Sequence, residues 1–121
     1  MCCAVFHYRL LFQINKASHT WPHEPSSLLH DAAETELDQA VAYYESCRQG
    51  LGIELADEVY RSVSLAMAFP EAGSPCSMNT RRLLVRRFPF GVIYRVKGQI
   101  VQVVAVSDLR RRPGYWCDRL M

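Results

Sequence analysis

Residues 81–119 decide the fold of this chain, and they read RRLLVRRFPFGVIYRVKGQIVQVVAVSDLRRRPGYWCDR. Lys97-Gly98 is interpreted as a two-residue turn, because glycine adopts the positive φ that such a turn requires. The runs on either side of it are rich in Val, Ile and aromatic residues, which favour strands. We therefore predict three consecutive strands followed by a basic and aromatic tail. The strands are expected at residues 82–88, 90–96 and 99–106.

A first helix is expected over about residues 31–48. Asp31 is the expected N-cap, and Glu34 follows it three residues later, as in a capping box. Apolar residues recur at three- and four-residue steps and predict a buried face, made of Ala33, Leu37, Ala40, Val41 and Tyr44. The carboxylates are expected on the solvated face, namely Glu34, Glu36, Asp38 and Glu45.

A second helix is expected over about residues 51–68. Gly50 is the expected C-cap of the first helix, and Phe69-Pro70 ends the second, because proline disfavours helix in the residue before it. The buried stripe of the second helix is expected at Leu55, Val59, Val63, Ala66 and Met67.

These helices and strands predict an α+β fold. A short edge strand is expected at residues 27–30, before the first helix. The helical hairpin would then pack on a small antiparallel sheet in the order β-α-α-β-β-β. Phe88 and Tyr94 are expected in the core between the two layers.

The chain has 121 residues, which suggests one domain. We assign residues 27–121 to it and residues 1–26 to an N-terminal extension of unknown role. Five cysteines without CxxC spacing favour reduced thiols in a cytoplasmic protein, and no apolar run is long enough to cross a membrane. No phosphate-binding loop, metal-ligand pattern or nucleophile motif occurs, so neither a cofactor nor a metal is expected.

Charge is distributed unevenly along the chain. Residues 1–80 hold four Lys or Arg and ten Asp or Glu, a balance of −6, whereas residues 81–121 hold ten and two, a balance of +8. This asymmetry predicts an anionic partner for the C-terminal half, either nucleic acid or an acidic protein segment. The alternative is that the two halves neutralise each other within the fold. The candidate binding residues are Arg81, Arg82, Arg86, Arg87, Arg110, Arg111, Arg112, Tyr115, Trp116 and Arg119.

Strand alternation divides the first four of these arginines. Arg82 and Arg86 share one face of their strand, and Arg81 and Arg87 share the other. Tyr115 and Trp116 have two interpretations, since aromatic rings beside arginines can stack on bases or can close the core beneath the sheet. We favour the core for Trp116.

Two segments of the chain and Arg119 form a pattern that resembles the RelE/ParE superfamily of bacterial type II toxins. The segments are FPFGVIYRV at residues 88–96 and AVSDLRRRPGYW at residues 105–116. The resemblance is closest to the ParE-like branch and covers about residues 27–119. It implies a growth-inhibiting toxin of a plasmid-stabilisation module. It also implies a small cognate antitoxin that wraps the helical hairpin and the sheet.

The resemblance implies two possible activities. RelE-type members cut mRNA on the ribosome, and their catalytic positions fall on Arg82, Arg110 and Tyr115 or Trp116. Two further basic positions of that set fall on Leu84 and Gly91. ParE-type members inhibit DNA gyrase by binding, without catalysis. In this chain, Ser107-Asp108 replaces the histidine-containing pattern of many ParE-like relatives.

Three functions therefore stay open at this point. We expect a gyrase-binding toxin that is not an enzyme. The alternatives are a ribosome-dependent mRNA endoribonuclease and an inactive relative that only binds its antitoxin. The expected partners are the antitoxin and DNA gyrase, with the ribosome and mRNA as the alternative to gyrase.

Overall fold

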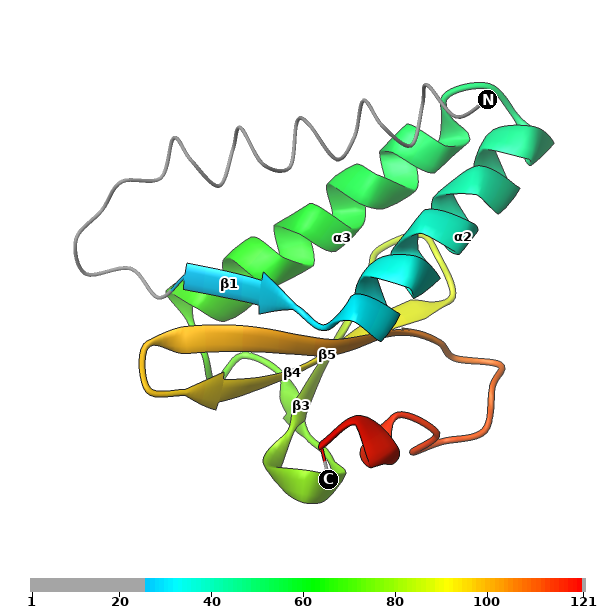
Figure 1. Cartoon of the computed structure of the whole chain (residues 1–121). Coiled ribbons are helices and arrows are strands. Elements are labelled where there is room, and N and C mark those ends of the chain that lie inside the picture. The colour runs from blue at the N-terminus through cyan, green and yellow to red at the C-terminus, as the bar shows by residue number, and fades with distance from the viewer. Residues whose placement is uncertain (1–25, 121) are drawn as a thin grey trace.

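The computed structural model describes residues 26–120, and it consists of a helical hairpin packed on one face of a five-stranded sheet (Figure 1). The hairpin is formed by α2 (Asp31–Cys47) and α3 (Leu51–Ala68). The strands are β1 (Ser26–Leu29), β2 (Ser74–Pro75), β3 (Arg81–Leu84), β4 (Phe90–Lys97) and β5 (Ile100–Asp108). Two short 3₁₀ helices are η1 (Ser77–Asn79) and η2 (Cys117–Leu120). The predicted α+β fold is confirmed, while residues 1–25 of the predicted extension lie outside the described residues.

The sheet has the order β1-β5-β4-β3-β2. Neighbouring strands from β2 to β5 are antiparallel, as predicted, but β1 runs parallel to β5. Two successive hairpins reverse the chain twice, so β5 runs in the same direction as β3. The helical hairpin brings the chain back to the starting end of β1, which is why β1 joins β5 in parallel (Figure 1).

Two turns of the sheet differ from the prediction by small shifts. The β4–β5 turn consists of Gly98-Gln99 rather than Lys97-Gly98, because Lys97 still pairs with Ile100. Gly98 has the expected positive φ, at 62°. Strand β3 ends at Leu84, so Arg86 and Arg87 lie in the turn before β4 and not on a strand face.

The helix caps also differ from the prediction. His30 rather than Asp31 caps α2, with its Nδ1 accepting a hydrogen bond from the Ala32 N–H at 3.1 Å. The reason is that His30 still belongs to the extended chain, since its N–H donates to the Val103 carbonyl at 2.9 Å. The C-cap of α2 is Arg48. Gly50, predicted as that cap, instead precedes α3 in a left-handed conformation.

The predicted buried faces of both helices are confirmed. Ala33, Leu37, Ala40 and Val41 of α2 and Leu55, Val59, Val63 and Ala66 of α3 are buried, and Tyr44 and Met67 are half-buried. Phe88 and Tyr94 are buried as well, as predicted. The Tyr94 hydroxyl donates to the Pro70 carbonyl at 2.8 Å and accepts from the Gly73 N–H at 3.0 Å. One side chain of β4 thus fixes the loop that follows α3.

Tyr94→Phe is expected to lower the free energy of unfolding by about 2 kcal/mol, because it leaves buried backbone groups of Pro70 and Gly73 without a partner. Urea unfolding of the purified chain measures this change. Tyr43→Phe is the matched control, since Tyr43 is exposed and no hydrogen bond of its hydroxyl is seen in the described residues. An equal loss in both variants would contradict the prediction.

Candidate functional site

The chain after β5 folds back under the sheet, and we call residues 109–120 the C-terminal segment. It lies on the face of the sheet opposite to the helical hairpin (Figure 1). Trp116 anchors it, because its indole is buried against Ile93, Val104 and Ala105. The core interpretation of Trp116 is therefore confirmed.

Glu36 of α2 connects the helical hairpin to the C-terminal segment. Its Oε1 accepts hydrogen bonds from Arg119 Nη1 at 2.7 Å and from the Val106 N–H at 3.2 Å. Its Oε2 accepts a hydrogen bond from the Tyr115 hydroxyl and lies 3.5 Å from Arg111 Nη1. The prediction that Glu36 is solvated is thus wrong, because both carboxylate oxygens are occupied and the side chain is only 12% exposed.

Tyr115 is held from two sides. The Arg111 guanidinium lies over its ring, 3.9 Å from the centroid, and its hydroxyl is bonded to Glu36. Burial, and then the hydrogen bond to Glu36, raise the pKa of Tyr115 to about 12. The hydrogen bond to Glu36 also raises the pKa of Arg119. The phenol therefore stays protonated near neutral pH and makes a poor general base.

Asp108 neutralises Arg110 at the end of β5. Arg110 donates from Nε to Oδ1 at 3.0 Å, from Nη2 to Oδ2 at 2.8 Å, and from its backbone N–H to Oδ1 at 2.9 Å. This hydrogen bonding lowers the pKa of Asp108, so the pair stays ionised at neutral pH. Asp108 thus neutralises the first arginine in the run.

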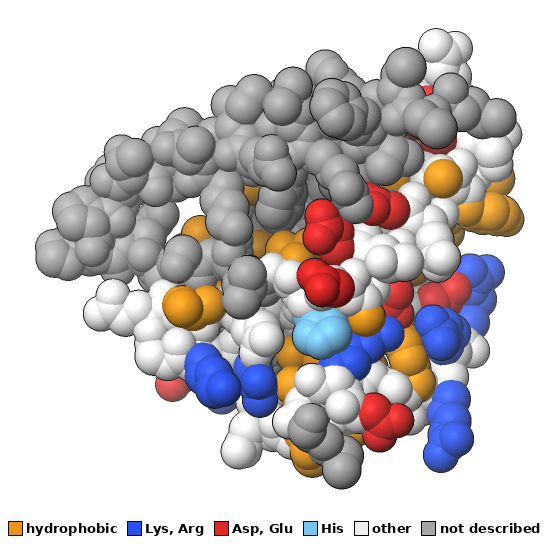
Figure 2. Space-filling view, viewed as in Figure 1, with side chains coloured by type: hydrophobic (Ala, Val, Ile, Leu, Met, Phe, Trp, Pro, Cys, Tyr) orange, Lys and Arg blue, Asp and Glu red, His pale blue; other side chains and the backbone are white. Residues whose placement is uncertain are grey.

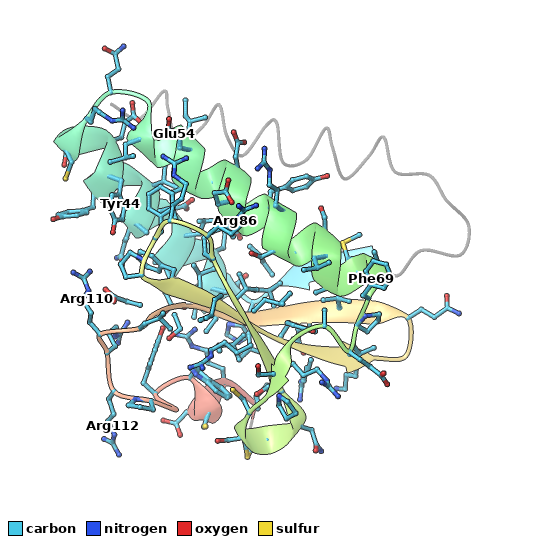
Figure 3. All side chains as sticks on the ribbon, turned by 180° about the vertical axis from the view of Figure 1, so that it is seen from behind. Tyr44, Glu54, Phe69, Arg86, Arg110 and Arg112 are labelled. Atoms are coloured by element: carbon cyan, nitrogen blue, oxygen red, sulfur yellow. The ribbon has the colours of Figure 1, made fainter. Side chains whose placement is uncertain are left out.

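The remaining predicted arginines fall into two groups. Arg81 donates to the backbone carbonyls of Glu71 and Gly73, and Arg87 forms an ion pair with Glu54 at 3.3 Å. By contrast, the exposed side chains of Arg82, Arg86 and Arg112 make no hydrogen bond or ion pair within residues 26–120. Arg112 and Arg110 point away from the sheet at one end of the molecule, and Arg86 lies beside α3 (Figure 3). Among the predicted arginines, Arg82, Arg86 and Arg112 are thus available to a partner in the described part of the chain.

The surface divides by charge as the sequence predicts. Figure 2 shows most of the visible Asp and Glu side chains over the helical hairpin, with Lys and Arg side chains gathered below it. The ion pairs of Glu36 and Glu54 with arginines of the C-terminal half are the predicted neutralisation between the two halves. The neutralisation within the fold is therefore confirmed for one group of arginines, and an anionic partner stays a prediction for the other.

Two concavities lie beside these arginines. One, of about 130 Å³, is lined by Arg82, Ser107, Arg111 and Trp116. The other, of about 290 Å³, has aromatic and apolar walls from Tyr43, Tyr44, Phe90 and Val106, together with Arg110 and Arg111. The second is large enough to receive an apolar side chain of a partner protein.

Gly91 lies close to Arg82 and Leu109, which line the first concavity. A Cβ at this position would lie 3.1 Å from Cγ and 3.2 Å from Cδ of Arg82, and 3.4 Å from Leu109. A side chain at Gly91 would therefore press closely against the Arg82 stem. Leu84, which pairs with Gly91 across the strands, is 60% exposed, whereas Gly91 is buried. At the two positions where the resemblance implies cations in a ribonuclease, this chain thus presents an exposed leucine and a buried glycine beside Arg82.

No group of His, Cys, Asp and Glu within the described range could hold a metal ion. The helices of that range include none with the length and apolar character needed to span a bilayer. Cys47, Cys76 and Cys117 are free thiols.

The family model described as the ParE toxin of the type II toxin–antitoxin system, parDE, matches residues 28–113. The chain belongs to the ParE toxin family. No curated protein matches it. Among solved structures, a chain of the chromosomal ParDE toxin–antitoxin system from P. aeruginosa is similar, with a TM-score of 0.64 and 23% identity. The match covers 73% of the present chain and 99% of that chain, and it shows the shared fold. Membership in the ParE family implies an antitoxin partner.

Sequence reasoning missed Glu36 as part of this site. Its neighbours Glu34 and Asp38 have the same chemistry and a similar spacing from the apolar stripe, so no local signal distinguishes Glu36. Its role depends on residues 79 and 83 positions further along the chain. Of the other candidates, the structure places Trp116 in the core and Arg119 in a half-buried network.

Proposed function

We propose that this ParE-family toxin acts by binding DNA gyrase in the cytoplasm, and that a cognate antitoxin of its module neutralises it. The observation that carries this proposal is the pair of positions Leu84 and Gly91. Two cations of the ribonuclease set are missing there, since Leu84 is apolar and exposed and Gly91 is buried beside the Arg82 stem. Such a surface suits contact with a protein better than stabilisation of a charged phosphorane.

The state of Tyr115 supports binding over catalysis. A ribonuclease of this fold needs a group that exchanges a proton during the reaction. The Tyr115 hydroxyl is hydrogen-bonded to Glu36 and its pKa is raised to about 12, and Trp116 is buried. Neither aromatic residue is placed as a free acid or base.

The cleft of about 290 Å³ is our candidate for antitoxin contact. Its aromatic walls can receive apolar side chains of an acidic, amphipathic segment. The carboxylates of that segment would compete with Asp108 and Glu36 for Arg110 and Arg111. Binding there would also cover Arg110 and Arg111, which line the cleft. An antitoxin in this position would therefore mask part of the basic surface, which accounts for neutralisation of a toxin of a plasmid-stabilisation module.

The experiment compares the wild-type chain with a variant that lacks the three arginines without a partner among residues 26–120, Arg82→Ala/Arg86→Ala/Arg112→Ala. We expect wild type to stop thymidine incorporation before amino-acid incorporation after induction, and to inhibit supercoiling by purified gyrase. The triple variant should inhibit at least about tenfold more weakly, which corresponds to about 1.4 kcal/mol of binding free energy. Lys97→Ala is the control, because Lys97 is an exposed basic residue that lies at the C-terminal end of β4, outside the proposed surface.

Two results would contradict this proposal. If protein synthesis stops first and mRNA is cut, the chain is a ribonuclease, and Arg82, which lines the smaller concavity with Arg111, becomes the first residue to mutate. If neither synthesis stops, the chain is an inactive relative that only binds its antitoxin.

A further inference from the structure

We propose that Glu36 is the positioning residue of the toxin, and that it fixes the C-terminal segment so that its arginines face the target. The fixing of the segment is independent of the proposed function, whereas its consequence for target binding rests on that function. No contact of Glu36 with the target is required. Glu36 acts through the residues it holds, which are Tyr115, Arg119 and Arg111.

The edge of β5 that faces β1 is only partly covered by strand pairing. Strand β1 covers this edge only as far as Val103, which pairs with Leu29, and His30 adds one more hydrogen bond to the Val103 carbonyl. Beyond that point the edge carries backbone groups that need partners. Glu36 accepts from the Val106 N–H at 3.2 Å, and Arg119 donates to the Val104 carbonyl at 3.0 Å. The Glu36–Arg119 pair thus takes the place of further strand pairing.

Glu36 and Arg119 form a largely buried ion pair. The Glu36 side chain is 12% exposed and that of Arg119 is 17% exposed, and Glu36 Oε1 lies 2.7 Å from Arg119 Nη1. Loss of one partner of such a pair strongly destabilises the fold around it, because the other charge is left poorly solvated. The pair therefore joins α2, β5 and the C-terminal segment into one unit, although these elements lie far apart in the sequence.

The middle arginine of the run, Arg111, lies between the Tyr115 ring, 3.9 Å from its centroid, and Glu36, at 3.5 Å. Arg110 and Arg112, on either side of it, point outward (Figure 3). Asp108 already fixes Arg110, so the contacts of the Arg111 side chain bear mainly on Arg112. Without Glu36, the start of the segment would still be held by backbone hydrogen bonds and its end by Trp116, but the side chains of Arg111, Tyr115 and Arg119 would each lose a partner.

Glu36→Gln is the decisive variant, because it keeps the shape and one acceptor oxygen and removes the charge. The full chain, copurified with its antitoxin and then separated from it, is studied by amide hydrogen exchange, gyrase supercoiling and growth arrest. We expect exchange of residues 109–120 to rise at least tenfold, while exchange in α3 and β4 stays at the wild-type rate. Gyrase inhibition and growth arrest should both weaken at least tenfold. Asp57→Asn is the control, an exposed carboxylate on α3.

A double-mutant cycle separates positioning from general stabilisation. Glu36→Gln weakens and Tyr115→Phe removes the same contact, so their combined effect on exchange should be clearly less than additive. The proposal is overturned if exchange of the segment is unchanged in Glu36→Gln, or if exchange rises equally throughout the chain. It is also overturned if the segment opens and growth arrest is unaffected. If the proposed function is wrong, the wild-type chain itself will not inhibit supercoiling by gyrase. Growth arrest by wild type and by Glu36→Gln can still be compared in that case, so the two failures are distinguishable.

Discussion

Trp116→Ala is expected to lower the free energy of unfolding by about 3–5 kcal/mol, the usual cost of truncating a large buried aromatic residue. The indole is 4% exposed and packs against Ile93, Val104 and Ala105. It is the largest side chain covering the sheet face opposite to the helices, so its removal exposes Ile93 and Val104 to water. A domain of this size is stable by only about 5–15 kcal/mol, and the loss should therefore be evident in urea unfolding.

Two comparisons make this prediction specific. Trp116→Phe keeps most of the apolar contact and should cost clearly less. Leu109→Ala removes an apolar side chain from the same segment, but Leu109 is 43% exposed and should change stability little. If Trp116→Ala unfolds at the same urea concentration as wild type, the indole does not anchor the segment.

Gly52→Ala is expected to lower the free energy of unfolding by about 3 kcal/mol, at the upper end of the usual cost of overpacking. A Cβ at Gly52 would lie 2.4 Å from the carbonyl oxygen of Val41, which belongs to the neighbouring helix. Because this neighbour is backbone, α2 and α3 would have to move apart. Without that contact, alanine would instead stabilise the helix by about 1 kcal/mol relative to glycine.

The sign of the change is therefore the test. Thermal unfolding of Gly52→Ala should occur well below that of wild type, whereas a higher midpoint would show that the helices are not in contact at Gly52. Gly98→Ala is a useful contrast, since Gly98 has a positive φ and a Cβ added there would meet no atom within 4 Å. It should cost only about 1–2 kcal/mol, from the strained backbone alone.

Local patterns predicted the elements of this fold because they report on local physics. The apolar periods in α2 and α3 reflect the face that each helix buries, and the Val- and Ile-rich runs reflect strands. The predictions were wrong at the ends of elements. His30 is hydrogen-bonded to β5, so the helix begins after it and His30 is the cap of α2. Strand β3 ends at Leu84, so Arg86 lies in the following turn.

The candidate site was predicted only in its composition. The sequence shows the arginine run and the adjacent Tyr115 and Trp116. It also shows that Leu84 and Gly91 stand where the resemblance implies cations in a ribonuclease. It could not show that Asp108 neutralises Arg110, or that Arg82, Arg86 and Arg112 have no partner within the described residues. Pairing of charges depends on distances between side chains, which the order of residues along the chain does not give.

The sequence by itself therefore determined the α+β order of elements, the charge asymmetry and the resemblance to ParE-type toxins. Only the tertiary structure decided the parallel position of β1, the contact of Gly52 with Val41, and the role of Glu36. Burial faces and strand propensity are properties of neighbouring residues, so they can be deduced along the chain. A carboxylate that binds residues 79 and 83 positions away obtains its role from folding, because only packing brings those groups together.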